Sequence, residues 1–243
     1  MAEADEFVTT FDDLVALNPK IEKVISAECW DYLGVNNKAT IGKLGDVWLK
    51  NIRKNLKVGL WEKHGGIYDA LFNFGFNKAV IGVGGGPSYK KNKQVLKEIM
   101  DTDGVRPWLE RDFYIMSSNH MYKTLLKDGV IPDFVILADG SDVVYDQLCK
   151  NVPEIGRHTI LLAGLHCSPR VLKEWSRQGR SIKFFVNKSK GHRELLHKLT
   201  GDDPENYAII AGGNVLNSAW VIALRYFNST TFFCVGNDLS FPV

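Results

Sequence analysis

The chain has few cysteines, and none of them form a paired motif. Its 243 residues include only Cys29, Cys149, Cys167 and Cys234, which are far apart in the sequence. Structural zinc sites built from cysteine need two closely spaced pairs, and disulfide frameworks are typical of oxidising compartments. We therefore expect no cysteine-based metal site and a cytoplasmic protein.

An excess of charge of either sign is also missing. Thirty Lys and Arg residues against 28 Asp and Glu residues leave a formal net charge of +2. Proteins that wrap nucleic acid need a large cationic excess, because their affinity comes mainly from phosphate contacts. We expect no nucleic-acid partner, although a local anion site remains open.

Long hydrophobic runs are absent as well. Thr159–Leu165 and Ala219–Leu224 are among the longest, and both fall far short of the roughly 20 residues that a membrane span requires. Met1–Phe7 carries three acidic residues and no basic one, unlike a signal peptide. We expect no membrane span.

The hydrophobic pattern changes at about residue 75. Before it, apolar residues recur three and four positions apart in Ile21–Trp30, Leu44–Leu56 and Gly66–Phe74, which predicts helices. After it, short apolar runs alternate with amphipathic stretches. The predicted strands are Lys78–Val83, Asp112–Ser117, Asp133–Ala138, His158–Ala163, Ser181–Val186, Tyr207–Ala211 and Thr231–Val235. The predicted helices between them are Lys90–Met100, Asn119–Asp128, Ser141–Lys150, Pro169–Gln178, His192–Thr200 and Val215–Phe227.

Alternating strands and helices predict an α/β fold. We expect a Rossmann-like, mostly parallel sheet with helices on both faces over residues 76–243, preceded by a helical N-terminal segment over residues 1–75. Ligands of such sheets bind at the carboxyl ends of the strands. Polar or glycine-rich residues follow all seven predicted strands. We therefore expect the ligand-binding residues to lie in these loops.

One loop has the composition of a phosphate cradle. The glycine turn, Gly84–Ser88, joins a predicted strand to a predicted helix, and its sequence is Gly-Gly-Gly-Pro-Ser. Glycines allow close approach of the backbone to a ligand, and a helix N-terminus favours an anion. The turn is neither the G-x-G-x-x-G of dinucleotide enzymes nor a P-loop. A tight turn that needs glycine only for packing is the alternative.

Other strand ends carry titratable side chains. Asp139 and Asp142 could hold Mg²⁺ opposite a diphosphate, or Asp142 could cap the following helix. His166 is a candidate general acid or base, and His120 is a comparable one. Asp238 follows the last predicted strand, where no helical pattern follows, so we expect it to contact a ligand rather than cap a helix.

These motifs resemble the motility-associated-factor and MptE-like family, which is itself distantly similar to bacterial sialyltransferases that use CMP-sugars. The motifs that carry the resemblance are Gly84-Gly85-Gly86-Pro87-Ser88, Ser118-Asn119, Ile131-Pro132-Asp133-Phe134 leading to Asp139, Gly212-Gly213-Asn214-Val215, and Val235-Gly236-Asn237-Asp238-Leu239. Trp48-Leu49-Lys50-Asn51, followed by Asn55, resembles the segment before the family's core. Two departures stand out: Asn214 replaces the usual serine, and Asp139 is followed by Gly-Ser-Asp.

The resemblance implies a nucleotide-dependent transferase. Gly84, Gly85, Gly86, Pro87 and Ser88 would hold phosphates, Asn119 would contact the sugar or base, and Gly212, Gly213 and Asn214 would form a second cradle. The donor would be a CMP-activated acidic sugar, with a protein or sugar as acceptor. One alternative is ATP with Mg²⁺ in a pyrophosphokinase that acts on a pterin-like alcohol. Another is a nucleotide-binding module without catalysis.

The length of the chain bears on this implied activity. The histidine base of the sialyltransferases lies beyond the last motif, and the chain stops at Val243. That histidine therefore has no counterpart at any position here. We expect that the natural protein continues beyond Val243 or that its ordered part ends there.

Overall fold

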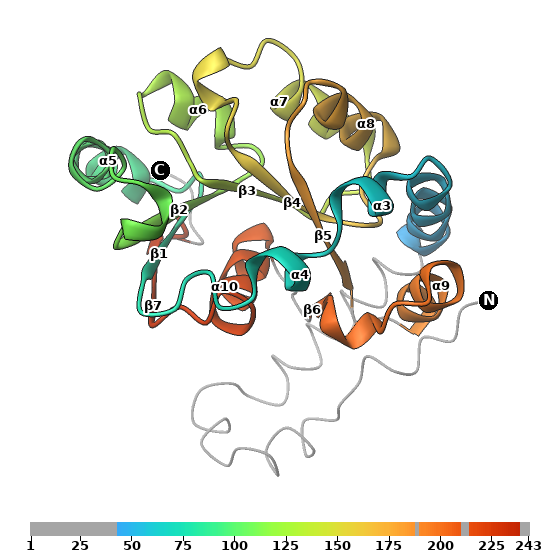
Figure 1. Ribbon diagram of the computed structural model, residues 1–243. Coiled ribbons are helices and arrows are strands. Elements are labelled where there is room, and N and C mark those ends of the chain that lie inside the picture. The colour runs from blue at the N-terminus through green and yellow to red at the C-terminus, as the bar shows by residue number, and fades with distance from the viewer. Residues whose placement is uncertain (1–42, 188–189, 210–213, 239–243) are drawn as a thin grey trace, which may run out of the picture.

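A seven-stranded parallel sheet forms the centre of the molecule (Figure 1). The computed structural model describes residues 43–187, 190–209 and 214–238. Across the sheet the strand order is β6-β5-β4-β3-β2-β1-β7, and every adjacent pair is parallel. The strands are β1 (Ala79–Val83), β2 (Phe113–Ser118), β3 (Phe134–Leu137), β4 (Ile160–Gly164), β5 (Ile182–Asn187), β6 (Ala208–Ile209) and β7 (Thr231–Val235).

The connections place helices on both faces of this sheet. From β1 to β6 the chain steps across the sheet in one direction, and β7 then returns to the far side of β1. Right-handed crossovers therefore put the last connection on the opposite face from the earlier ones. The helices are the one formed by residues 43–57, α3 (Leu60–His64), α4 (Ile67–Leu71), α5 (Ser88–Thr102), α6 (Tyr122–Lys127), α7 (Tyr145–Leu148), α8 (Pro169–Arg177), α9 (Lys190–Thr200) and α10 (Val215–Arg225). Figure 1 shows α5 to α8 on one face and α4 with α10 on the other.

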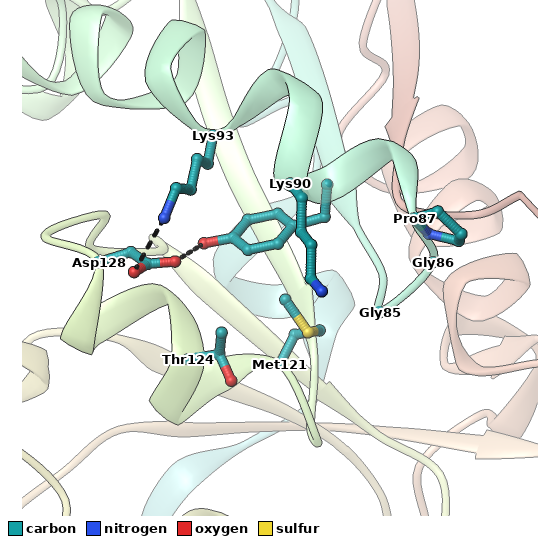
Figure 2. Close-up of a pocket in the computed structure, with 9 residues that line it drawn as sticks. Gly85, Gly86, Pro87, Lys90, Lys93, Met121, Thr124 and Asp128 are labelled. Carbon is teal, nitrogen blue, oxygen red and sulfur yellow. Dashed lines mark hydrogen bonds and ion pairs between the residues drawn. The ribbon is translucent and has the colours of Figure 1, made fainter. Parts of the chain in front are cut away.

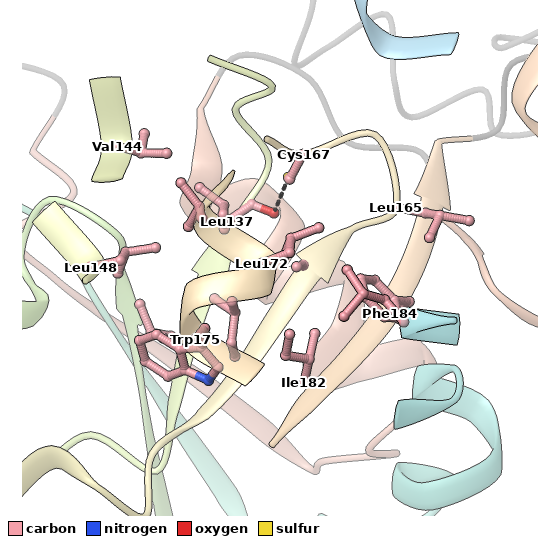
Figure 3. Packing of buried hydrophobic residues seen from close by; sticks show 14 of the residues in the cluster. Leu137, Val144, Leu148, Leu165, Cys167, Leu172, Trp175, Ile182 and Phe184 are labelled. Atoms are coloured by element: carbon pink, nitrogen blue, oxygen red, sulfur yellow. Dashed lines mark hydrogen bonds between the residues drawn. The ribbon is translucent and has the colours of Figure 1, made fainter. Parts of the chain in front are cut away.

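Alternate residues of the strands pack into different layers of the core. In β3, Val135 and Leu137 join the cluster under α6 and α8, while Phe134 and Ile136 join the cluster under α10. Figure 3 shows the first cluster, where Trp175 of α8 packs over the sheet beside Leu148. Because both faces are covered, the central strands are apolar throughout, as expected of a parallel sheet.

The predicted fold class is confirmed, and the seven predicted strands are present. The predicted helix Ser141–Lys150 is wrong in detail: a 3₁₀ turn, η3 (Asp142–Val144), precedes the single-turn helix α7. The predicted helix Asn119–Asp128 begins only at Tyr122, because residues 119–121 form a turn that buries Asn119. The predicted helix Ile21–Trp30 lies outside the described residues, as does the end of the predicted strand Tyr207–Ala211.

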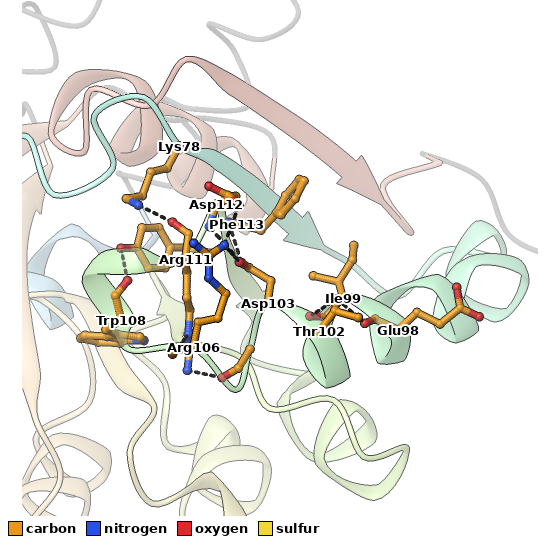
Figure 4. A network of polar contacts seen from close by, with 12 residues as sticks. Lys78, Glu98, Ile99, Thr102, Asp103, Arg106, Trp108, Arg111, Asp112 and Phe113 are labelled. Carbon is orange, nitrogen blue, oxygen red and sulfur yellow. Dashed lines mark hydrogen bonds and ion pairs between the residues drawn. The ribbon is translucent and has the colours of Figure 1, made fainter.

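The amino ends of β1, β2 and β3 are tied together by a polar network (Figure 4). The Asp103 carboxylate accepts hydrogen bonds from the backbone N–H groups of Asp112 and Phe113, at 3.0 and 2.9 Å. Arg111 forms an ion pair of 2.5 Å with Asp133, whose other oxygen accepts the N–H of Ile115. Because these polar groups hydrogen-bond to one another, they stabilise the amino edge of the sheet rather than bind a ligand.

The described N-terminal helices belong to the same core as the sheet. Ile52, Leu56 and Trp61 pack in the α6 and α8 layer, and Ile67 packs under α10. Within the described residues, none of the helices is long and apolar enough to cross a membrane.

Candidate functional site

Two loops meet where the strand order reverses. The glycine turn follows β1, and Gly236–Asp238 follows β7, the strand that pairs with β1 on its other side. The Gly84 N–H donates to Val235 O at 2.8 Å, and the Gly86 N–H donates to Gly236 O at 2.7 Å. In return, the Gly236 N–H donates to Ser88 Oγ at 2.8 Å. The carboxyl ends of these two strands thus form one backbone-built site at the position where open α/β sheets bind ligands.

The glycines of the turn are required by close contacts. A Cβ atom on Gly84 would lie 2.4 Å from Gly236 O, and one on Gly86 would lie 2.6 Å from Asp238 Oδ2. A Cβ atom on Gly85 would lie 2.4 Å from His120 Nε2. Packing therefore accounts for Gly84 and Gly86. Gly85 is exposed and faces only the end of a side chain, so it leaves room for a ligand.

Asp238 caps a helix that begins 150 residues before it in the sequence. Its Oδ2 atom accepts the backbone N–H of Ser88, the first residue of α5, at 2.6 Å. Hydrogen bonds from the Ser88 side chain and backbone hold the pKa of Asp238 below its usual value. Asp238 thus caps α5, and its predicted contact with a ligand stays a prediction. The cap could not be foreseen, because it joins residues remote in the chain.

His120 lies directly beside the glycine turn. It is exposed, and its Nδ1 atom is 3.2 Å from the Ser118 hydroxyl at the end of β2. Partial burial lowers the pKa of His120 below its usual value. Of the two candidate histidines, His120 is the one that the fold brings to the predicted phosphate position.

The two predicted asparagine contacts differ in position. Asn214 Oδ1 accepts the N–H of Asn217 at 3.1 Å and so caps α10, while its Nδ2 donates to Asn237 at 3.3 Å. Asn119 is buried, and its Nδ2 donates to Gln147 Oε1 at 2.6 Å. Asn214 therefore adjoins the loop after β7, whereas Asn119 is turned towards α7. Gly212 and Gly213 lie outside the described residues.

Asp139 and Asp142 lie near the carboxyl end of β3, two strands away from the glycine turn. Both are exposed. Asp139 Oδ1 accepts the Ser141 N–H at 2.8 Å, and Asp142 Oδ1 accepts the hydroxyl of Ser168, which also caps α8. Asp142 therefore binds a serine rather than capping its own helix. The other oxygen of each carboxylate is left for a ligand.

His166 is buried at the end of β4. Its side chain is 1% exposed, and its Nε2 donates to Ala138 O at 2.9 Å. Its ring lies 4.9 Å from that of Trp48 and 5.5 Å from that of His192. Burial lowers the pKa of His166 to about 4, so the ring is neutral. The adjacent Cys167 thiol donates to Leu137 O, and burial raises its pKa.

The arrangement around His166 is that of a packed side chain. The sheet spacing of roughly 4.8 Å puts the end of β4 about 14 Å from the end of β1, so His166 and the glycine turn do not converge. Its predicted acid–base role stays a prediction that a substrate complex would test.

The helix of residues 43–57 covers this part of the sheet edge. Asn51 Nδ2 donates to Gly140 O and His166 O at 3.0 and 3.1 Å. Asn55 Nδ2 donates to Leu165 O and Cys167 O at 2.8 and 3.0 Å. The spacing of four residues between the two asparagines, which puts them on one helix face, was the available signal for this docking.

The Mg²⁺ expected with ATP can be tested against these residues. The described residues contain no group of three or more His, Cys, Asp or Glu side chains placed to hold a metal ion. Mg²⁺ is often held by one or two carboxylates together with substrate phosphates and water. The exposed carboxylates of Asp139 and Asp142 fit that limited role.

Comparison with known proteins connects this geometry to a family. Residues 48–243 match the family described as 6-hydroxymethylpterin diphosphokinase MptE-like. A structural relative is the MAf glycosyltransferase of Magnetospirillum magneticum AMB-1, with a TM-score of 0.53 and 21% sequence identity over 70% of this chain. The match covers 24% of that protein, so the chain spans about a quarter of its length. None of the curated proteins matches the chain.

The resemblance expected from the motifs is confirmed by this match. The structural relative, at 21% identity, shares the fold of this chain. With more than three quarters of its length matched, the chain belongs to the 6-hydroxymethylpterin diphosphokinase MptE-like family.

Proposed function

We propose that the protein is a nucleotide-dependent transferase whose donor phosphates bind at the glycine turn. The observation that carries this proposal is the exposed backbone of Gly85, which lies beside His120 where the strand order reverses. The Gly85 N–H donates to none of the described residues. Because glycine has no side chain of its own, a phosphate oxygen can approach this N–H closely.

The chemistry would consist of positioning and charge stabilisation. The Gly85 N–H would hold a phosphate oxygen, and the His120 Nε2–H group would donate a hydrogen bond to the departing phosphate. Fixed donors of this kind stabilise charge that develops on a leaving group, because they need no reorganisation during the reaction. The Ser118 hydroxyl, bonded to His120 Nδ1, would keep the ring in place.

The finer form of the proposal is a glycosyltransferase-like enzyme that uses a CMP-activated acidic sugar. The motif order shared with sialyltransferases supports it, and so does the fold shared with a glycosyltransferase. The acceptor would be a sugar or a protein, and the protein would act in the cytoplasm.

A pyrophosphokinase is the second candidate, favoured by the description of the family. Here ATP with Mg²⁺ would transfer a diphosphate to a pterin-like alcohol, with Asp139 and Asp142 holding the cation. The ion would neutralise the phosphates, and the two carboxylates would orient it. A nucleotide-binding module without catalysis is the outcome if neither reaction takes place.

Nucleotide binding separates these candidates. Calorimetry should be run with CMP, CDP, GTP and ATP, each with and without Mg²⁺, on the wild type and on Gly85→Val. Gly191→Ala serves as the control, because its Cβ would meet only Leu49 at 3.5 Å. Gly85→Val should abolish binding, since its side chain fills the space beside His120.

The nucleotide that binds distinguishes the candidate functions. Binding of cytidine nucleotides without metal, with release of CMP from a CMP-sugar, supports the glycosyltransferase. Binding of ATP only with Mg²⁺, formation of AMP and loss of both in Asp139→Ala support the pyrophosphokinase. Absence of binding by all four nucleotides would overturn the proposal, and unchanged binding by Gly85→Val would overturn the placement of the phosphate.

A further inference from the structure

A surface cavity of about 580 Å³ adjoins the glycine turn on the side of α5 and α6. Figure 2 shows it between Gly85 and Gly86 on one side and Met121 and Thr124 on the other. Cavities of roughly 300–1,000 Å³ are typical of small-molecule sites. The cavity could therefore hold much more than a single phosphate group.

The charges that line this cavity do not balance. Asp128 is the single acidic side chain among its lining residues, and it is already engaged: its carboxylate accepts the Tyr89 hydroxyl at 2.7 Å and lies 3.6 Å from Lys93 Nζ. Lys90 also lines the cavity, yet it forms no ion pair with any described residue. The cavity thus presents one uncompensated ammonium group next to the turn.

The opposite side of the turn is already filled by the protein. There the Gly86 and Ser88 N–H groups donate to Gly236 O and to the Asp238 carboxylate. A phosphate on that side would have to displace these partners and would be repelled by an ionised carboxylate. On the cavity side, Gly85 and Lys90 line the space, and neither the Gly85 N–H nor the Lys90 ammonium group bonds to another of the described residues.

We propose that the donor's phosphate binds in the cavity between α5 and α6, held by Gly85 and Lys90, and not at the N-terminal N–H groups of α5. This inference rests on the proposed function and adds to it the face of the turn and the residue that neutralises the phosphates. The hydroxyl of Thr124 and the apolar side chain of Met121 line the space next to that group.

Two adjacent lysines of α5 provide a matched test. Lys90 lines the cavity, whereas Lys91 lies on the other side, near enough to Asp238 to lower its pKa. Both are exposed, so neither Lys90→Met nor Lys91→Met should disturb folding. Titrations of both variants with pyrophosphate and with CDP should be followed by calorimetry at constant ionic strength.

Lys90→Met should weaken binding of both probes by about ten- to a hundredfold, since it removes a charge-assisted hydrogen bond. Lys91→Met should change the dissociation constant less than twofold. Thr124→Glu, which adds a carboxylate to the cavity, should weaken binding as Lys90→Met does.

Other results would overturn the inference. A larger effect of Lys91→Met than of Lys90→Met places the phosphates on the Asp238 side, and equal effects indicate attraction by the helix as a whole. If pyrophosphate binds and Lys90→Met weakens it, but none of the nucleotides binds, the cavity is an anion site and the proposed nucleotide donor is wrong. If the wild type binds neither probe, both proposals fail.

Discussion

Asn55 holds a helix in place with one amide group. The side chain is fully buried, and its Nδ2 donates to the carbonyl oxygens of Leu165 and Cys167. Asn55→Ala leaves both carbonyls buried without this donor, so we expect the free energy of unfolding to fall by about 2–4 kcal/mol. Urea denaturation measures this change. Lys50→Ala, at an exposed position of the same helix, should stay within about 0.5 kcal/mol of the wild type; an equal loss in both variants would contradict the assigned docking.

His166 makes stability depend on pH. Its pKa is about 4 in the folded protein and 6.5 in the unfolded chain, so the unfolded state binds more protons below pH 6.5. Stability from this group is complete above pH 6.5 and is lost as the pH falls towards 4. Between pH 7 and pH 5 the loss is about 2 kcal/mol.

His166→Gln removes this titration. From pH 7 to pH 5 the free energy of unfolding of the wild type should therefore fall by about 2 kcal/mol more than that of His166→Gln. Chemical denaturation at both pH values measures this difference. A stability difference that stays constant between pH 7 and pH 5 would show that His166 is not buried as described.

At the level of single residues, the sequence indicated which residues form the glycine turn, but not which side chains contact one another. Three consecutive glycines identify the turn, because few residue types can replace them where backbones approach closely. Asn119 donates to Gln147 and Asp238 caps α5, two contacts that the sequence did not predict, and the predicted ligand contacts of both residues stay predictions. Both partners come from distant parts of the chain, and local spacing carries no information about them.

At the level of elements, β1 and β7 depend on a glycine between them. A Cβ atom on Gly84 would lie 2.4 Å from the backbone oxygen of Gly236, which cannot rotate away as a side chain can. Gly84→Ala should therefore lower the free energy of unfolding by about 1–3 kcal/mol. Gly191→Ala, in α9 and without such a contact, should be neutral or stabilising by up to about 1 kcal/mol. Thermal or urea unfolding compares the two, and an equal effect would contradict the close contact.

Elements were more predictable than contacts, because periodicity reports directly on burial. Continuous apolar runs located the strands, and β7 matches its predicted bounds, Thr231–Val235. The error at Ser141–Lys150 arose where a short helix follows a 3₁₀ turn held by the Ser168 contact to Asp142. That contact is tertiary, so hydrophobic spacing could not reveal the break.

At the level of the whole molecule, a net charge of +2 conceals an uneven distribution. It argues against a broad polyanion surface. The candidate site needs no such surface, because it uses a backbone N–H and one lysine that forms no ion pair with the described residues. The helix of residues 43–57 bonds to the loops after β3 and β4, away from the reversal at β1 and β7 where the glycine turn lies.

Amide NMR of Gly85 would detect a phosphate bound at the glycine turn. Uniformly labelled protein would be titrated with pyrophosphate and with CDP. The Gly85 resonance is identified by its loss in Gly85→Ala, and Gly191 serves as the internal reference. We expect a saturable shift of the Gly85 amide while the Gly191 amide stays in place. Saturable shifts elsewhere with an unmoved Gly85 amide, or no shift at all, would contradict the placement of the phosphate at the glycine turn.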